Sequence, residues 1–275
     1  MNPRLGEYIR GNSAAEQARL RTPLPILTQS AGRLLDAVGV GAGWQVLEVG
    51  CGPRGILDLL AERVGPAGSV VGLDRDPVFL ELARSFVAEQ SCTNVLLVEG
   101  DSKASGLPDG SFDFAYAQRV LINLPEPERV VDEMLRLVRP GGVVGLVEMD
   151  DSPAGCDPPH PAWDRLKGVR DAAHQQAGRW GVNGRRLPGL MRSAGLTDIE
   201  VEVAVGIHGH GEAGRVNFLA TFDSSQEALI AGGFVTEQEL VGLTESLRDY
   251  LDDPTVVVHS PMIVAAWGRK PASNA

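Results

Sequence analysis

The chain has 275 residues, of which 43% are hydrophobic, and this length suffices for one well-buried α/β domain with a smaller covering element. Its 36 acidic and 25 basic residues give a formal net charge of −11, which would repel nucleic acid and anionic membrane surfaces. We therefore expect no nucleic-acid partner and no membrane partner, and no apolar run reaches the length needed to cross a bilayer.

The cysteines are three in number, Cys51, Cys92 and Cys156. An odd number without metal-ligand spacing, together with an N-terminal segment that lacks the features of a secretory signal, predicts reduced thiols and a cytoplasmic protein. No metal site is expected.

Residues 1–44 are expected to form a helical cover ahead of the first strand. Ser13 and Glu16 have the spacing of a capping box, and the leucines that follow give an interrupted apolar face. Pro23 and Pro25 divide this helical segment in two.

A strand predicted over 45–49 is followed by three closely spaced glycines, Gly50, Gly52 and Gly55. Glycine lets the backbone approach a ligand closely, and the helix that follows presents its free N–H groups to that ligand. The next apolar run ends in Asp74, whose carboxylate can accept hydrogen bonds from both hydroxyls of a ribose. This pattern predicts a nucleotide-like cofactor.

The same glycine spacing also fits the dinucleotide fingerprint, so an NAD(P)-dependent oxidoreductase is the first alternative. Glu48 argues against it, because a carboxylate two residues before the first glycine can receive the cationic amino group of a ligand. Asp101 ends the third apolar run and can accept from an adenine amino group. A pyrophosphate would gain nothing from these acids, whereas S-adenosylmethionine would.

The segments after the first strand alternate between strand and helix, as a doubly wound parallel sheet requires. Asp76-Pro77 and Pro125 to Pro127 have the composition of helix starts, and Arg139 to Gly142 that of a helix end. A strand is expected over 112–120 and another over 143–149. The carboxyl ends of such strands meet at one edge of the sheet, where open α/β sheets bind their ligands.

This series of motifs, from Gln45 to about Val205, resembles the class I S-adenosylmethionine-dependent methyltransferases, in particular the small-molecule branch that includes the ubiquinone and menaquinone biosynthesis enzymes. The resemblance implies a Rossmann-like, seven-stranded, mostly parallel sheet with helical lid insertions. One departure is that Pro53 and Arg54 intervene before Gly55, where the family's third glycine usually comes earlier.

The resemblance also implies which residues hold the cofactor. The first motif falls on Glu48, Gly50 and Gly52, the ribose-binding acid on Asp74, and the adenine-side acid on Asp101. The residues expected to contact S-adenosylmethionine are Glu48, Gly50, Cys51, Gly52, Asp74, Arg75, Asp101, Ser102, Gln118 and Arg119. Cys51 could be read as a nucleophile, but we interpret it as a small side chain packed behind the turn.

We expect residues 45–150 to form the cofactor-binding core and residues 151–184 to form a lid insertion. Residues 185–275 complete the core, with a helix over 184–194, a strand over 198–208, a helical insertion at about 209–253 and the last strand over 255–267. In this family such insertions, with the N-terminal prefix, cover the acceptor. The stretch 8–12 is expected to be the ligand-facing part of that prefix, unless the prefix only pads the domain edge.

Methyl transfer from a sulfonium requires alignment of donor and acceptor and the exclusion of water. A phenol or alcohol acceptor would also gain from a nearby base, and His160 and His174 in the first insertion are the candidates. Arg119 could hold an acidic or phenolate acceptor. His208 and His210 could line the acceptor cavity, whereas His259 is expected to be a core residue far from the cofactor end.

Asp150 and Asp151 could act as a base or as metal ligands at the end of the fifth strand. A Mg²⁺ site is disfavoured because Gln118 and Arg119 stand where a third carboxylate would be needed. The leading hypothesis is a methyltransferase acting on a small, partly apolar metabolite, with an oxygen acceptor slightly favoured over carbon or nitrogen. A methyltransferase-like cyclase and a non-transferring cofactor-binding protein stay open, and a homodimer is allowed.

Overall fold

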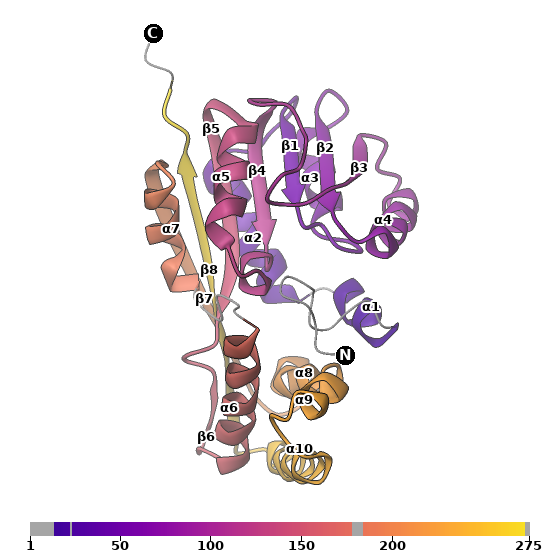
Figure 1. Cartoon of the computed structure of the whole chain (residues 1–275), viewed down its shortest axis with the longest axis vertical. Coiled ribbons are helices and arrows are strands. Elements are labelled where there is room, and N and C mark those ends of the chain that lie inside the picture. The colour runs from indigo at the N-terminus through magenta and orange to yellow at the C-terminus, as the bar shows by residue number, and fades with distance from the viewer. Residues whose placement is uncertain (1–13, 23, 178–183, 273–275) are drawn as a thin grey trace.

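A single sheet with helices on both faces forms the upper part of the molecule (Figure 1). The computed structural model describes residues 14–22, 24–177 and 184–272. The strands are β1 (Gln45–Val49), β2 (Ser69–Asp74), β3 (Val95–Glu99), β4 (Phe112–Gln118), β5 (Val138–Asp150), β6 (Gly155–Asp157), β7 (Thr197–His208) and β8 (Val257–Arg269). They follow the order β3-β2-β1-β4-β5-β8, with β6 and β7 also paired to β8.

The first five strands are parallel, and β8 runs antiparallel to β5, β6 and β7. The predicted doubly wound α/β class is therefore confirmed. The described residues contain eight strands where seven were expected, because the short strand β6 adds to β8 inside the first insertion.

The helices fall into two layers on the sheet and a third layer beyond it. They are α1 (Ala14–Arg21), α2 (Pro25–Val38), α3 (Leu57–Val64), α4 (Pro77–Glu89), α5 (Pro127–Leu137), α6 (Pro161–Gln176), α7 (Leu187–Ser193), α8 (Asn217–Asp223), α9 (Gln226–Ala231) and α10 (Glu237–Leu251). Short 3-10 helices are η1 (Leu121–Asn123), η2 (Gly184–Arg186) and η3 (Ala213–Val216).

Two hydrophobic clusters fix the sheet between its helices. Val46 faces one cluster, with α2, α3 and α4, whereas Leu47 and Val49 face the other, with α5 and α7. This division follows from the alternation of side chains along a strand, and a strand covered on both faces is apolar throughout.

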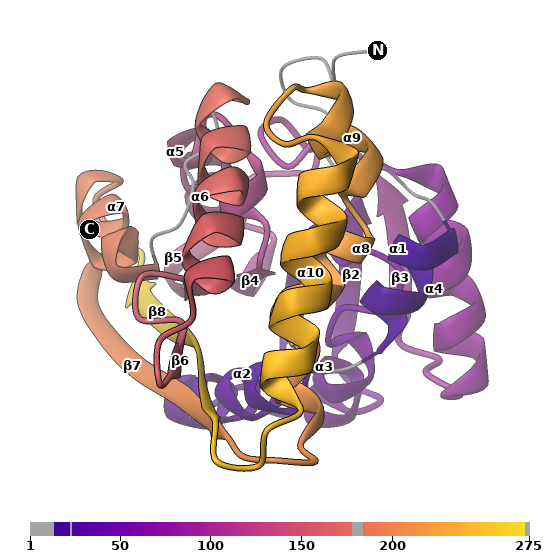
Figure 2. The same cartoon turned by 90° about the horizontal axis from the view of Figure 1, so that it is seen from below.

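A third cluster unites α6, α8, α9 and α10 in a layer beyond the carboxyl ends of the parallel strands. Trp163 of α6 is buried there and stacks on Phe218 of α8, with ring centroids 4.1 Å apart. α6 and α10 pack side by side in this layer, as the view from below shows (Figure 2). We call these four helices the helical cover. No helix within the described ranges combines the length and apolar character that a bilayer crossing requires.

Several expected boundaries differ from the observed ones. β5 begins at Val138 instead of 143, because Val138 pairs with Phe112 ahead of an irregularity in the β4–β5 register. The last strand is displaced by two residues, since the Asp253 carboxylate caps the turn at Thr255 and Val256 packs into the helical cover. The helix expected over 184–194 is split into η2 and α7.

The expectation for His259 was wrong. β8 is antiparallel to β5, and its Met262 already pairs with Asp150 at the carboxyl end of β5. His259 therefore lies past that edge, half-buried between Gly155 of β6 and Ile207 of β7. The stretch 8–12 and Ser13 of the expected capping box lie outside the described residues.

Candidate active site

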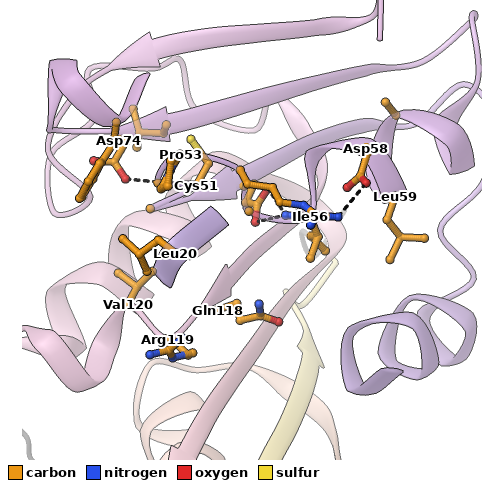
Figure 3. Close-up of a pocket in the computed structure, with 18 of the residues that line it drawn as sticks. Leu20, Cys51, Pro53, Ile56, Asp58, Leu59, Asp74, Gln118, Arg119 and Val120 are labelled. Carbon is orange, nitrogen blue, oxygen red and sulfur yellow. Dashed lines mark hydrogen bonds and ion pairs between the residues drawn. The ribbon is translucent and has the colours of Figure 1, made fainter. Parts of the chain in front are cut away.

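A cavity of about 1110 Å³ lies at the carboxyl ends of the parallel strands, the edge at which open α/β sheets bind ligands (Figure 3). Its walls come from the loop after β1, the turns after β2 and β3, the corner after β4, and the segment from α1 to α2. The cavity also extends along α3 to residues 90–94 ahead of β3. The predicted residues that line it are Glu48, Gly50, Cys51, Gly52, Asp74, Arg75, Ser102, Gln118 and Arg119.

The glycine loop needs glycine for both conformation and space. Gly50, Gly52 and Gly55 all have left-handed φ values, of 67°, 57° and 53°. A Cβ at Gly50 would lie 2.5 Å from Cγ2 of Val120. The amide of Gly50 donates to the Leu73 carbonyl at 2.7 Å, which ties the loop to the end of β2.

Glu48 is buried beneath this loop. Both carboxylate oxygens accept from the amide of Ile56, at 3.0 and 3.1 Å. Burial raises the pKa of Glu48 to about 8, although the Ile56 hydrogen bond works in the opposite direction. A Cβ at Gly55 would collide with this carboxylate, so the displaced third glycine makes room for Glu48.

Asp74 joins β2 to the glycine loop. Its Oδ2 accepts from the amide of Gly52 at 2.8 Å, and its Oδ1 accepts from the amide of Asp76 at 2.9 Å. Burial raises the pKa of Asp74, against the effect of these hydrogen bonds. The carboxylate is half-buried and forms part of the cavity wall, and the side chain of Arg75 beside it is exposed.

Asp101 does not line the cavity, unlike the other residues that were predicted to contact the cofactor. Gly100 and Ser102 line the cavity, whereas Asp101 is exposed and accepts from the amide of Lys103 at 2.9 Å. Its predicted contact with adenine stays a prediction.

The corner after β4 brings Gln118 and Arg119 to the cavity. The Tyr116 hydroxyl donates to Oε1 of Gln118 at 2.8 Å. Arg119 has a φ of 58°, which is unusual for a residue with a Cβ, and its amide donates to the Val147 carbonyl at 2.9 Å. The backbone turn therefore places Arg119 at the end of β4.

Cys51 is buried behind the loop, and burial raises the pKa of its thiol well above the ordinary value. A thiol kept protonated is a poor nucleophile. Its position supports the interpretation of Cys51 as a packed side chain.

Glu148 was not among the predicted site residues, and it is fully buried near the carboxyl end of β5. One carboxylate oxygen accepts from the amides of Leu121 and Ile122, at 2.7 and 3.4 Å. Burial raises its pKa to about 7, partly offset by these hydrogen bonds and by Arg119. The signal that could have found it is an acid within an apolar strand, a feature that Glu48 in β1 shares.

None of the five histidines lines the cavity, and all five lie within the described ranges. His160 caps the first turn of α6, where its Nδ1 accepts from the amide of Ala162 at 3.3 Å and its ring stacks on Tyr250. The structure therefore does not bring His160 to the site, because its backbone position before Pro161 favours an N-cap. His174 lies in the last turn of α6. His208 contacts Glu212, and His210 is exposed.

Asp150 and Asp151 each face a cation. Asp150 is fully buried and pairs with Arg185 and Ser152, and Asp151 lies 3.4 Å from Arg170. Burial opposes ionisation of Asp150, but the hydrogen bonds from Ser152 and Arg185 outweigh it and lower its pKa. In the part of the chain that the structure describes, no three His, Cys, Asp or Glu side chains are grouped to hold a metal.

Comparison with known proteins identifies the segment that builds most of this cavity. Residues 47–146, from β1 into β5, match the family model described as a methyltransferase domain. Residues 47–146 thus form a methyltransferase domain. The resemblance to S-adenosylmethionine-dependent methyltransferases is thereby confirmed, and the dinucleotide alternative loses its support.

The methyltransferase domain has curated relatives and structural neighbours. A demethylmenaquinone methyltransferase of Listeria monocytogenes serotype 4a (strain HCC23) is 33% identical over 127 residues, which are 46% of this chain and 51% of that protein. The chain thus spans about half the length of the curated relatives it matches.

Two solved structures share the fold. A Bacillus halodurans C-125 protein described as a methyltransferase superposes with a TM-score of 0.60 at 19% identity, over 89% of this chain and 100% of that one. The (4+2)-cyclase SpnF superposes with a TM-score of 0.53 at 21% identity, over 90% of this chain and 81% of that one. At such identities these likenesses establish the fold alone.

Proposed function

We propose that this protein transfers a methyl group from S-adenosylmethionine to a small, partly apolar acceptor. The observation that carries the proposal is the convergence of the glycine loop, Asp74 and the Gln118–Arg119 corner on one cavity at the carboxyl edge of the sheet. These are the groups that the cofactor requires: close backbone approach, a ribose-binding carboxylate and a polar wall near the reacting end.

The residues present fit this cofactor. In the proposal Asp74 binds the ribose hydroxyls, Ser102 and Asp101 flank the adenine, and Glu48 receives the amino group directly or through water. The backbone of Gly50, Cys51 and Gly52, with Arg75 and Gln118, completes the predicted contact set.

S-adenosylmethionine supplies an electrophilic methyl group on a sulfonium. The protein then has to align the acceptor and exclude water, and alignment alone can supply on the order of 7–11 kcal/mol. Leu20, Leu24 and Leu27, with Val120 and Leu124, give the cavity its apolar wall. This wall favours a partly apolar acceptor, and the helical cover with α1 is proposed to enclose it.

Arg119 is the proposed partner of the acceptor's reacting group. It lines the cavity, whereas the histidines that could serve as bases do not. An acceptor that enters as a phenolate or enolate needs no base, and a guanidinium would hold its oxygen. A slight preference for an oxygen acceptor stays part of the proposal, and the name of the Listeria relative makes demethylmenaquinone and similar compounds the first to test.

The cyclase in the structural comparison keeps a second candidate open, a protein that binds the cofactor without transferring its methyl group. Incubation of the full chain with S-adenosylmethionine and a panel of quinols, phenols and amines separates the two. Transfer yields S-adenosylhomocysteine and an acceptor heavier by one methylene unit. A cyclase or non-transferring protein yields neither. The homodimer and the cytoplasmic location stay predictions.

A further inference from the structure

Glu148 lies beside the cavity without lining it. Its side chain is 1% exposed, and Oε1 accepts from the two consecutive amides that begin η1. Within the described residues Oε2 has no hydrogen-bond partner. A buried carboxyl group is costly to keep in an apolar strand, so its retention calls for a specific role.

The segment that Glu148 holds, from Arg119 to Ile122, includes an unfavourable backbone conformation. Arg119, just before η1, has left-handed backbone angles that cost free energy unless the surroundings enforce them. The Arg119 amide donates to Val147, and the side chain of Asn123 donates to the Arg119 carbonyl at 2.7 Å. Glu148 completes this set by satisfying the amides of Leu121 and Ile122.

The corner in turn shapes the cavity. Val120 packs so closely over Gly50 that no Cβ would fit between them, and Arg119, Val120 and Asn123 all contribute to the wall. A displacement of η1 would therefore change both the glycine loop and the polar wall. We propose that Glu148 is a positioning residue, whose buried carboxyl group fixes the corner between β4 and η1 and thereby sets the ligand affinity of the cavity. For the identity of the ligand, this inference rests on the proposed function.

The protonation state of Glu148 does not alter this role. Its pKa of about 7 leaves charged and neutral forms populated near neutrality, and either form keeps an oxygen that accepts from the η1 amides. The charged and titratable groups that face it are Arg119 at the corner and Tyr116 on β4, and its partner on β8 is the apolar Val264. A glutamine should therefore substitute closely for the carboxyl group.

The test compares Glu148→Ala and Glu148→Gln with Asp113→Ala. Asp113 is a matched control, because its carboxylate accepts from the amide of Gln45 at 2.7 Å at the opposite end of β4, away from the cavity. Two readouts are used on the full chain: hydrogen exchange of the amides in 119–124 without ligand, and calorimetric affinity for S-adenosylhomocysteine.

Glu148→Ala should lose protection over 119–124 and bind S-adenosylhomocysteine at least about tenfold more weakly, equivalent to about 1.4 kcal/mol. Glu148→Gln should keep both properties within about threefold, a difference of under about 1 kcal/mol. Asp113→Ala should lower the overall stability and leave both readouts unchanged. Should Glu148→Ala fail to fold, Glu148→Asp withdraws the carboxyl group by one methylene and should behave as predicted for alanine.

Wild-type protection and affinity in Glu148→Ala, or equal losses in Asp113→Ala, would overturn the inference. So would a glutamine variant as defective as the alanine variant. Failure of the wild-type chain to bind S-adenosylhomocysteine would overturn the proposed function instead, and the exchange data would still decide whether Glu148 fixes the corner.

Discussion

In the proposed function, Asp74 is the residue on which cofactor recognition depends most directly. Its two oxygens already accept from the amides of Gly52 and Asp76, so the carboxylate is held in one orientation at the cavity wall. A carboxylate has more acceptor positions than these two amides use, and the remaining ones are available to ribose hydroxyls.

Replacement of Asp74 by asparagine should weaken S-adenosylhomocysteine binding by about 2–4 kcal/mol, because charge-assisted hydrogen bonds become neutral and one acceptor is lost. Isothermal titration would measure the change. Asp36→Asn is a suitable control, since Asp36 pairs with Arg63 and does not line the cavity. Unchanged affinity in Asp74→Asn would show that the ribose assignment is wrong.

The buried glutamates predict an unusual pH dependence of stability. The pKa values of Glu48 and Glu148, about 8 and about 7, lie above the value of 4.5 expected when the chain is unfolded. At a pH between 4.5 and these higher values, the two carboxyl groups are ionised in the unfolded chain and still protonated in the folded protein. The contribution of Glu48 and Glu148 to the free energy of unfolding is therefore fully present below about pH 4.5 and is lost as the pH rises through 7 to 8.

Urea unfolding of the ligand-free protein at pH 5 to 8 would measure this loss. Glu148→Gln should lack the part of this loss that comes from Glu148, which is at most about 3 kcal/mol. The variant should therefore gain stability relative to the wild type as the pH rises. Parallel pH profiles for the two proteins would contradict the assigned burial. Arg136 lowers the pKa of Glu133 to about 2, so Glu133 changes the stability only below the range of pH 5 to 8, and it does so equally in both proteins.

At the scale of elements, the parts that local sequence determines were predicted well. The β1 strand, its glycines and Asp74 form a continuous local pattern, and α4 begins at Pro77 after the N-cap Asp76, as expected. A strand covered on both faces is a short apolar run, and a following ligand-binding turn needs glycine or an acid at a fixed place. Such signals are visible without knowledge of tertiary contacts.

The helical cover could not be predicted in the same detail. β6 exists only because β8 extends past β5, and the displacement of His259 has the same origin. His160 was a candidate base by its chemistry, but its position before Pro161 makes it a helix cap. Tertiary pairing decides such placements, and the residue types alone do not reveal it.

The glycine loop offers a matched pair of substitutions. Gly50 and Gly52 share left-handed φ values, so alanine should cost about 1–2 kcal/mol of strain at either position. Only at Gly50 would the new Cβ overlap Val120, which should add about 1–3 kcal/mol. Denaturant unfolding should therefore find Gly50→Ala less stable than Gly52→Ala. Equal stabilities would contradict the close packing of the loop against the β4 corner.

At the scale of the whole molecule, the sheet and the helical cover are separate layers, and the family match lies within the first. Residues 47–146 match the methyltransferase family and build most of the cofactor wall, whereas α6 and α8 to α10 lie outside that match. The ion pair of Asp151 with Arg170 joins the end of β5 to α6 of the cover, and that of Asp150 with Arg185 joins β5 to η2. Arg119, Val120 and Leu124, the proposed acceptor contacts, lie inside the family match, whereas Leu20, Leu24 and Leu27 of the apolar wall lie outside it.

The most direct test of the account is a calorimetric titration of the full chain with S-adenosylmethionine, S-adenosylhomocysteine, NADH and NADPH in parallel. Both adenosyl ligands should bind at one site per chain, Asp74→Asn should weaken both, and the nicotinamide cofactors should not bind. Binding of NADH or NADPH without binding of the adenosyl ligands would contradict the assignment of the glycine loop, Glu48 and Asp74 to S-adenosylmethionine.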